Sequence, residues 1–340
     1  MIEKETILNI KNVYTATAFE RDGAFIVAAG SETEPEVQLM RLVHREVERL
    51  PDCPGGMMSF VPVPGEPGQF VSVMGLFPPF IGTEAGLYLH EFMAGQWKTI
   101  RAMDLPFAHR CEILRDGKRN FLLAASVSRF KENPSDWSLP GELHLIDLDS
   151  QSGTPWESVV MEQHVIRNHG MSRAWINGKE TLCISGAEGI FYLERESSGR
   201  WELRPVFEGE VSEMSFVDLD GDGRDELVTI EPFHGETLAI YKRSGNRWER
   251  RFSAPLSFGH GLSAGKFNGN PVVVTGNRSG SYNLEMFTVI NLTQEDVRKM
   301  VVEHDAGPTQ TQVFRMDGKD YILSANQRKH EVALYSGVPE

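Results

Sequence analysis

The sequence predicts an all-β protein: a seven-bladed β-propeller that forms one domain over residues 1–340. Two observations lead to this prediction. A module of four short strands recurs along the chain, and its last copy lacks a strand that the N-terminal segment can supply. A single four-stranded sheet of this kind cannot bury both of its faces, whereas a ring of such sheets buries them by stacking.

The clearest part of the module is a polar turn followed by an apolar strand. It occurs at residues 22–30, 67–75, 117–126, 178–186, 223–231, 269–276 and 318–326. The strand after each copy mostly alternates apolar and polar residues, which is the period of a β-strand. A tryptophan marks the outer strand of four copies: Trp97, Trp156, Trp201 and Trp248. We expect the blades at about 12–52, 53–104, 105–165, 166–210, 211–257, 258–305, and 306–340 together with 2–11.

The N-terminal segment is expected to close the ring. The seventh copy ends at Glu340 before a fourth strand can form, and residues 5–10 otherwise have no partner. If this segment is the outer strand of the last blade, two sheet edges are hidden from other chains. Six blades plus an extra hairpin is the alternative, because the second copy matches the module less well.

Composition narrows the classes of partner. The formal net charge of -14 argues against nucleic acid or an anionic membrane, since both require a basic surface. The most apolar stretch is interrupted by prolines and glycines, and the first residues do not form a secretory signal. Three cysteines without CxxC spacing indicate reduced thiols, so we expect a cytoplasmic protein.

One loop has the composition of a calcium site. Carboxylates alternate with glycines between the first and second strands of the fifth copy, as at the start of calcium-binding loops. The predicted ligands are Asp218, Asp220, Asp222, the carbonyl group of Arg224, and either Asp225 or Glu226. An apolar strand begins at Leu227, which excludes a twelve-residue EF-hand loop.

Residues 216–228, FVDLDGDGRDELV, resemble the FG-GAP/VCBS type of propeller repeat. Members of that family carry such loops for calcium, so the resemblance implies a structural calcium ion here. The full motif occurs once, and residues 21–23, 268–270 and 316–318 keep reduced forms of it. A tight acidic turn without a metal is the alternative.

Histidines recur at the start of the innermost strands. His109, His169 and His260 begin these strands in the third, fourth and sixth copies, and in a propeller these positions surround one mouth of the channel. Three neutral imidazoles with an open position can hold a catalytic transition metal, or they can act as general bases. Hydrogen bonds to the backbone of the next blade, without any ligand, are the alternative.

The loops after the second strands reach the same mouth. They supply candidate ligand-binding residues: Glu188, Glu231, His234, Asn277, Arg278, Asn326, Gln327 and Arg328. Insertions at 76–84 and 127–139 are long enough to form a rim or lid. We expect a small anionic or polyhydroxylated ligand at this mouth, such as a carbohydrate derivative, with metal-assisted lyase, isomerase or hydrolase chemistry. A non-catalytic scaffold that binds a protein partner, for example through the apolar residues 76–80, is the alternative.

Overall fold

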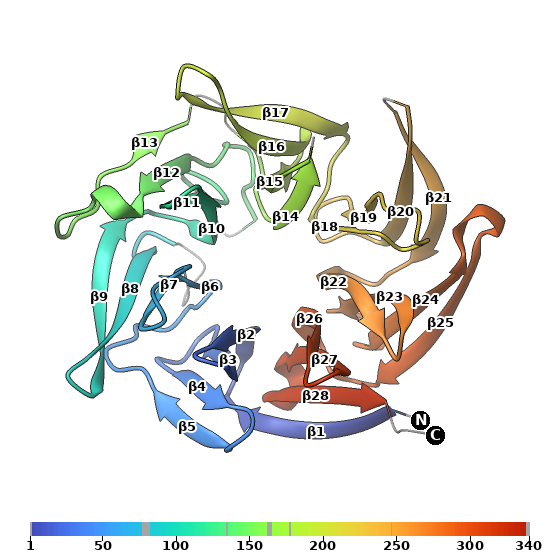
Figure 1. The fold of residues 1–340 in the computed structure, drawn as a ribbon, viewed down its shortest axis with the longest axis horizontal. Coiled ribbons are helices and arrows are strands. Elements are labelled where there is room, and N and C mark those ends of the chain that lie inside the picture. The colour runs from blue at the N-terminus through green and yellow to red at the C-terminus, as the bar shows by residue number, and fades with distance from the viewer. Residues whose placement is uncertain are drawn as a thin grey trace.

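The computed structural model describes residues 2–76, 82–133, 135–161, 165–176, 178–245 and 247–337. They form seven four-stranded antiparallel sheets arranged in a ring, which confirms the seven-bladed propeller and excludes the six-bladed alternative (Figure 1). No helix among these residues is long and apolar enough to cross a membrane.

Each blade runs from an inner strand at the channel to an outer strand at the rim. Blade 1 consists of β2 (Val13–Arg21), β3 (Ala24–Ser31), β4 (Val37–Arg41) and β5 (Glu46–Arg49). Blade 2 consists of β6 (Ser59–Pro62), β7 (Gln69–Met74), β8 (Gly86–Met93) and β9 (Gln96–Asp104). Blade 3 consists of β10 (Ala108–Asp116), β11 (Arg119–Ser126), β12 (Leu143–Asp147) and β13 (Val159–Val160). Blade 4 consists of β14 (Met171–Ile176), β15 (Lys179–Gly186), β16 (Gly189–Arg195) and β17 (Trp201–Glu208). Blade 5 consists of β18 (Glu213–Val217), β19 (Glu226–Glu231), β20 (Thr237–Ser244) and β21 (Arg247–Pro255). Blade 6 consists of β22 (Gly259–Phe267), β23 (Asn270–Asn277), β24 (Leu284–Asn291) and β25 (Asp296–Glu303). Blade 7 consists of β26 (Pro308–Met316), β27 (Lys319–Asn326), β28 (Glu331–Gly337) and β1 (Ile2–Asn9).

The N-terminal strand closes the ring as predicted. Strand β1 pairs antiparallel with β28, from Ile2 opposite Gly337 to Asn9 opposite Glu331, and the two strands lie side by side in Figure 1. Its apolar side chains, Ile7 and Leu8, pack in a cluster shared by blades 7 and 1. The chain ends are therefore held by both backbone pairing and burial.

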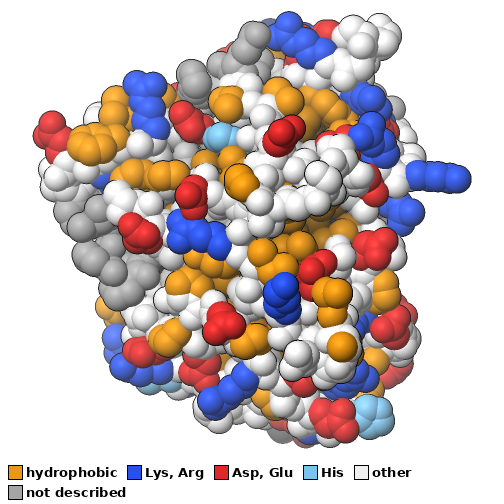
Figure 2. Space-filling model, turned by 90° about the vertical axis from the view of Figure 1, so that its left-hand side faces the viewer, with side chains coloured by type: hydrophobic (Ala, Val, Ile, Leu, Met, Phe, Trp, Pro, Cys, Tyr) orange, Lys and Arg blue, Asp and Glu red, His pale blue; other side chains and the backbone are white. Residues whose placement is uncertain are grey.

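The hydrophobic core lies between neighbouring blades. One buried cluster joins blades 1, 2 and 3, and another joins blades 3 and 4. The tryptophans mark the outer parts of the blades: Trp97, Trp201 and Trp248 lie in β9, β17 and β21, while Trp156 precedes the short strand β13. On the side drawn in Figure 2, acidic, basic and apolar side chains are interspersed, so the acidic surplus is not concentrated there.

Candidate functional site

Four of the innermost strands, β2, β10, β22 and β26, begin with a local irregularity in pairing. In β2 and β10 the pairing skips one residue, Tyr14 and His109 respectively, as in a β-bulge. Two residues before these positions, Asn12 and Phe107 have positive φ values of 50° and 58°. Bulges of this kind re-aim a side chain, and here they place Tyr14 and His109 at the same mouth.

The bulge in β22 falls one residue later. The skipped residue is Gly261, with φ of 59°, and a Cβ atom on it would lie 3.2 Å from the Cα atom of Gln310 in blade 7. The positive φ and this close approach both favour glycine. The histidine of blade 6 is therefore His260, directly before the bulge.

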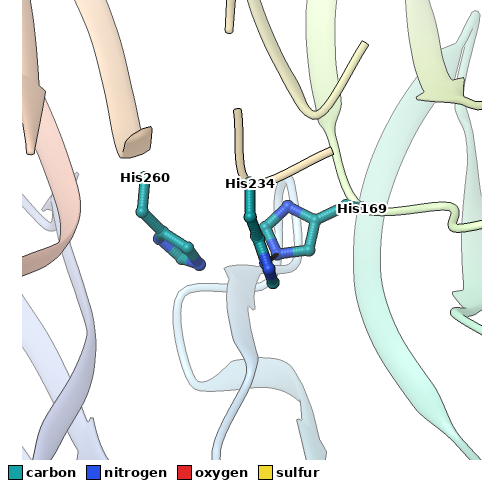
Figure 3. Close-up of side chains that lie close together, drawn as sticks. All are labelled: His169, His234 and His260. Carbon is teal, nitrogen blue, oxygen red and sulfur yellow. Dashed lines mark hydrogen bonds between the residues drawn. The ribbon is translucent and has the colours of Figure 1, made fainter. Parts of the chain in front are cut away.

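Three histidines from three blades meet at this mouth. His169 precedes β14, His234 lies in the loop between β19 and β20, and His260 lies in β22. One nitrogen from each ring lies within 4.8 Å of those from the other two. Figure 3 shows the rings entering one space, with His169 and His234 close together and His260 set apart. His109 is beside this group, with its ring centroid 4.5 Å from that of His169, but it is not one of the three.

The two nearest imidazoles have the spacing of ligands on one ion. The Nε2 atoms of His169 and His234 are 3.2 Å apart. Around a tetrahedral zinc ion with Zn–N bonds of 2.0–2.1 Å, two ligand atoms are separated by about 3.3 Å. The pair can therefore take up such an ion with little rearrangement.

The other ring nitrogens are held by the protein. Nδ1 of His260 lies 2.6 Å from the carbonyl oxygen of Thr309, so it carries the proton and leaves the Nε2 lone pair available. Nδ1 of His169 lies 2.7 Å from Oε1 of Glu213, although its N–H is not aligned for a regular hydrogen bond. Metal-binding histidines usually contact a backbone carbonyl or a carboxylate through the second nitrogen in this way.

Burial keeps these imidazoles neutral. It lowers the pKa of His109, His169 and His260 well below the usual value, and the pKa of His234 to about 2. The charge of Arg110 lowers all four pKa values further, and that of Arg278 lowers those of His169, His234 and His260. Neutral imidazole is the form that binds a metal, so no proton has to be displaced from a charged ring.

A tyrosine links the remaining histidines. The hydroxyl oxygen of Tyr14 lies 3.2 Å from Nε2 of His260 and 3.4 Å from Nε2 of His109. Since Nε2 of His260 has no proton, the hydroxyl donates to His260 and accepts from His109. Nδ1 of His109 is then a buried nitrogen without a partner among the described residues. Burial also raises the pKa of Tyr14 to about 12.

An ion pair lies under the histidines. Arg110 donates to Oε1 of Glu213 at 2.8 Å and to the carbonyl oxygen of His169 at 3.0 Å. Both side chains of this pair are largely buried, with exposed fractions of 13% and 10%. The pair ties blades 3, 4 and 5 together and leaves little net charge of its own.

Aromatic side chains cover the site. The ring centroid of Phe233 lies 4.0 Å from that of His234 and 5.5 Å from that of His169. Trp137, from the predicted lid at 127–139, packs on Phe233 at 4.9 Å. Five cavities of 420–760 Å³ among the described residues are lined by other side chains than these histidines. A small ligand at this mouth stays a prediction.

Few of the predicted rim residues reach the histidines. His234 does, and Arg278 lies beside them, with its guanidinium 5.8 Å from the ring centroid of Tyr14 and a hydrogen bond to Gln327. The others form hydrogen bonds with nearby protein groups. Glu188 accepts from the amide of Ile166, Glu231 from the hydroxyl of Tyr241, and Asn277 from the amide of Ser257. Asn326 donates to the hydroxyl of Tyr335, and Arg328 donates to the carboxylate of Asp305.

The acidic loop lies between β18 and β19. It brings oxygens of Asp218, Asp220 and Asp222 within 4.8 Å of one another. The Lys242 ammonium group contacts Asp220 and Asp222 and lies 3.8 Å from Glu226. Glu226 accepts a hydrogen bond from the amide of Leu219, and burial raises the pKa of its carboxyl group to about 7. The backbone amide of Arg224 donates a hydrogen bond to Asp222. Calcium at this loop stays a prediction.

Calcium binding at this loop would compete with Lys242, because both cations require the same carboxylates. We expect Lys242→Met to bind calcium more tightly than the parent, and Asp220→Ala with Asp222→Ala to abolish binding. At a calcium concentration of 100 times Kd the gain in stability is about 2.7 kcal/mol. Thermal melts with and without calcium measure it. Equal stabilisation of the double variant and the parent would place the ion elsewhere.

The fold defines the class of this protein: it is a β-propeller. No family model and no curated protein matches the chain. Among solved structures it is similar to the β-propeller domain of Cps50 (Swd1) from Myceliophteria thermophila, with a TM-score of 0.61 and 10% identity over 99% of this chain and 100% of that one. At this identity the likeness shows the fold alone. It supports a propeller and gives no support to membership of the FG-GAP/VCBS family.

Tyr14, Arg110 and Glu213 belong to the site but were not identified from the sequence. One signal was present for Tyr14: it follows Val13 at the start of the first inner strand as His109 follows Ala108 in the third. Arg110 and Glu213 carry no such signal, because they meet only when three blades are placed around the channel.

Proposed function

We propose that this propeller binds a transition-metal ion, in the first place zinc, through His169, His234 and His260. The observation that carries the proposal is the convergence of these three imidazoles from three blades, with two Nε2 atoms 3.2 Å apart. Nitrogen ligands suit zinc, copper, iron and nickel, while calcium and magnesium prefer oxygen. The groups that contact the Nδ1 atoms, the carbonyl of Thr309 at His260 and the carboxylate of Glu213 at His169, also favour metal binding through the opposite ring nitrogens.

The enclosed position favours a structural role for the ion. His169 and His260 are buried, and Phe233 and Trp137 cover the approach to His234. An ion here would join blades 4, 5 and 6 by bonds between residues far apart in sequence, which stabilises the folded chain only. Lyase, isomerase or hydrolase chemistry on a carbohydrate derivative would require the cover to open.

The test is metal binding by protein purified without chelator. We expect one zinc ion per chain, and about 2.7 kcal/mol of added stability at a zinc concentration of 100 times Kd. His234→Ala should abolish this gain without unfolding the chain, because His234 is a half-buried loop residue. The exposed His44 gives the matched control, His44→Ala, which should bind like the parent. Unchanged binding by His234→Ala, or none by the parent, would contradict the proposal.

A groove between blades 4 and 5 favours a second function, binding of a protein partner. Its volume is 760 Å³, and its lining includes Trp175, Tyr192, Phe216, Trp248, Arg224 and Arg243. Trp175 is 67% exposed. Aromatic residues and arginine are enriched at protein interfaces, and the two arginines suit an acidic peptide. Of the predicted apolar rim at 76–80, residues 77–80 lie outside the described residues.

A fluorescent peptide of alternating glutamate and leucine probes this groove, with a lysine–leucine peptide as the matched control. We expect binding of the acidic peptide only, and Trp175→Ala with Arg243→Ala to weaken it by about tenfold or more, because such anchors dominate interfaces. Fluorescence anisotropy measures both affinities. Equal binding of the two peptides, or binding unaffected by the substitutions, would reject the groove as a peptide site.

A further inference from the structure

The histidine cluster contains a second close pair of potential ligand atoms. The hydroxyl oxygen of Tyr14 and Nε2 of His260 are 3.2 Å apart, as are the Nε2 atoms of His169 and His234. The two pairs share no atom. Two opposite edges of a tetrahedron likewise have no corner in common, so the two pairs correspond to two such edges. In a tetrahedral zinc site each edge, the distance between two ligand atoms, is about 3.3 Å.

We propose that Tyr14 is the fourth ligand of the ion, and that the site is a closed set of three imidazoles and one phenolate oxygen. The proposal rests on the proposed function, the binding of the ion by the three histidines. When the ion binds, the Tyr14 oxygen bonds to it and the hydroxyl proton leaves to solvent. Nε2 of His260 loses its hydrogen bond from Tyr14 and bonds to the ion instead.

The surrounding charges favour this ligand. Arg278 lies over the ring of Tyr14, and its hydrogen bond to Gln327 connects it only indirectly to the carboxylate of Glu32. Arg110 is already neutralised by Glu213. Three neutral imidazoles would leave the full charge of a divalent ion next to Arg278. A phenolate removes one unit of that charge, which lowers the cost of burying the ion.

The proposal also gives His109 a role. Its Nε2 atom lies 3.4 Å from the Tyr14 oxygen and is the side that carries the proton in the arrangement derived above. His109 would therefore donate to the phenolate oxygen and hold it toward the ion. In this tautomer the buried Nδ1 atom of His109 is an acceptor, and it has no donor among the described residues. His109 is then a positioning residue and not a ligand.

The experiment compares the parent chain, Tyr14→Phe and Tyr282→Phe. Tyr14→Phe keeps the ring and removes one oxygen, and Tyr282→Phe is the matched control, since Tyr282 lies outside the cluster in blade 6. One equivalent of copper(II) should give the parent and the control a visible phenolate-to-copper charge-transfer band that Tyr14→Phe lacks. Zinc affinity should fall by about tenfold or more in Tyr14→Phe, because loss of even an outer-sphere partner costs about 10–100-fold.

The outcomes separate the two proposals. Absence of metal binding in the parent would overturn the proposed function and this inference with it. Binding by the parent without a phenolate band, or with the same zinc affinity in Tyr14→Phe, would leave the histidine site standing and overturn the role of Tyr14. A melt of each variant without metal confirms that the fold is intact.

Discussion

Removal of residues 2–10 is expected to destabilise the protein by about 5 kcal/mol or more. The truncation takes away strand β1 and with it three buried side chains, Ile7, Leu8 and Ile10. Full burial of each such side chain contributes about 1.5–3 kcal/mol. It also leaves β28 as an open edge that can pair with another chain. A loss of this size is a large part of the 5–15 kcal/mol that typically stabilises a folded domain.

Chemical denaturation and light scattering measure the two effects of this truncation, lower stability and aggregation. Leu8→Ala alone should cost about 2–5 kcal/mol, because it removes a large side chain from the cluster between blades 7 and 1. Glu3→Ala is the control, since Glu3 is exposed on the same strand and its change should stay within about 0.5 kcal/mol. A truncated chain that melts like the parent and stays monomeric would show that β1 does not close the ring.

Acidification is expected to destabilise this protein well above the pH range in which most carboxylates titrate. His90 is fully buried and bonded to Ser72 and Thr99, and burial lowers its pKa to about 3. The unfolded chain, with a histidine pKa of about 6.5, therefore binds a proton before the folded chain does. The stability due to neutral His90 is present above pH 6.5 and is lost as the pH falls from 6.5 toward 3, by about 1.4 kcal/mol per pH unit.

Denaturant titrations at pH 7.5, 6.5, 5.5 and 5.0 measure this loss. For His90 alone it amounts to about 2 kcal/mol at pH 5.0. His90→Gln keeps groups for hydrogen bonds to Ser72 and Thr99 but does not titrate, so the pH slope should fall by about one proton. His44→Gln, at an exposed position, should keep the slope of the parent. An unchanged slope in His90→Gln would mean that His90 does not stay neutral in the folded state.

The fold was predictable because its signals are local. A strand with alternating apolar residues and a polar turn with glycine can be recognised within about ten residues, and seven copies of the module define seven blades. The closing strand was predictable by the same reasoning, since an incomplete last copy and an unpaired first segment complement each other. The acidic loop was also local, and its three aspartates meet as their spacing predicts.

The composition of the histidine cluster was only partly predictable. Repeat phase identified His169 and His260 correctly as neighbours, but it placed His109 in the group of three, where the structure has His234. A bulge adds one residue and changes the direction of the next side chains, and it falls on Tyr14, His109 and Gly261 in different blades. Such a shift leaves no clear mark in a hydrophobic pattern.

The sequence by itself thus determined the number of blades, their order and the way the ring closes, because these depend on strand periodicity along the chain. Only the tertiary structure decided which side chains meet at the channel mouth. Tyr14 and His260 are separated by 246 residues and touch because the ring brings blade 1 near blade 6 across the channel. Their distance depends on blade packing, on bulge positions and on loop conformations such as that of His234, with φ of 48°. None of these is encoded in the period of the repeat.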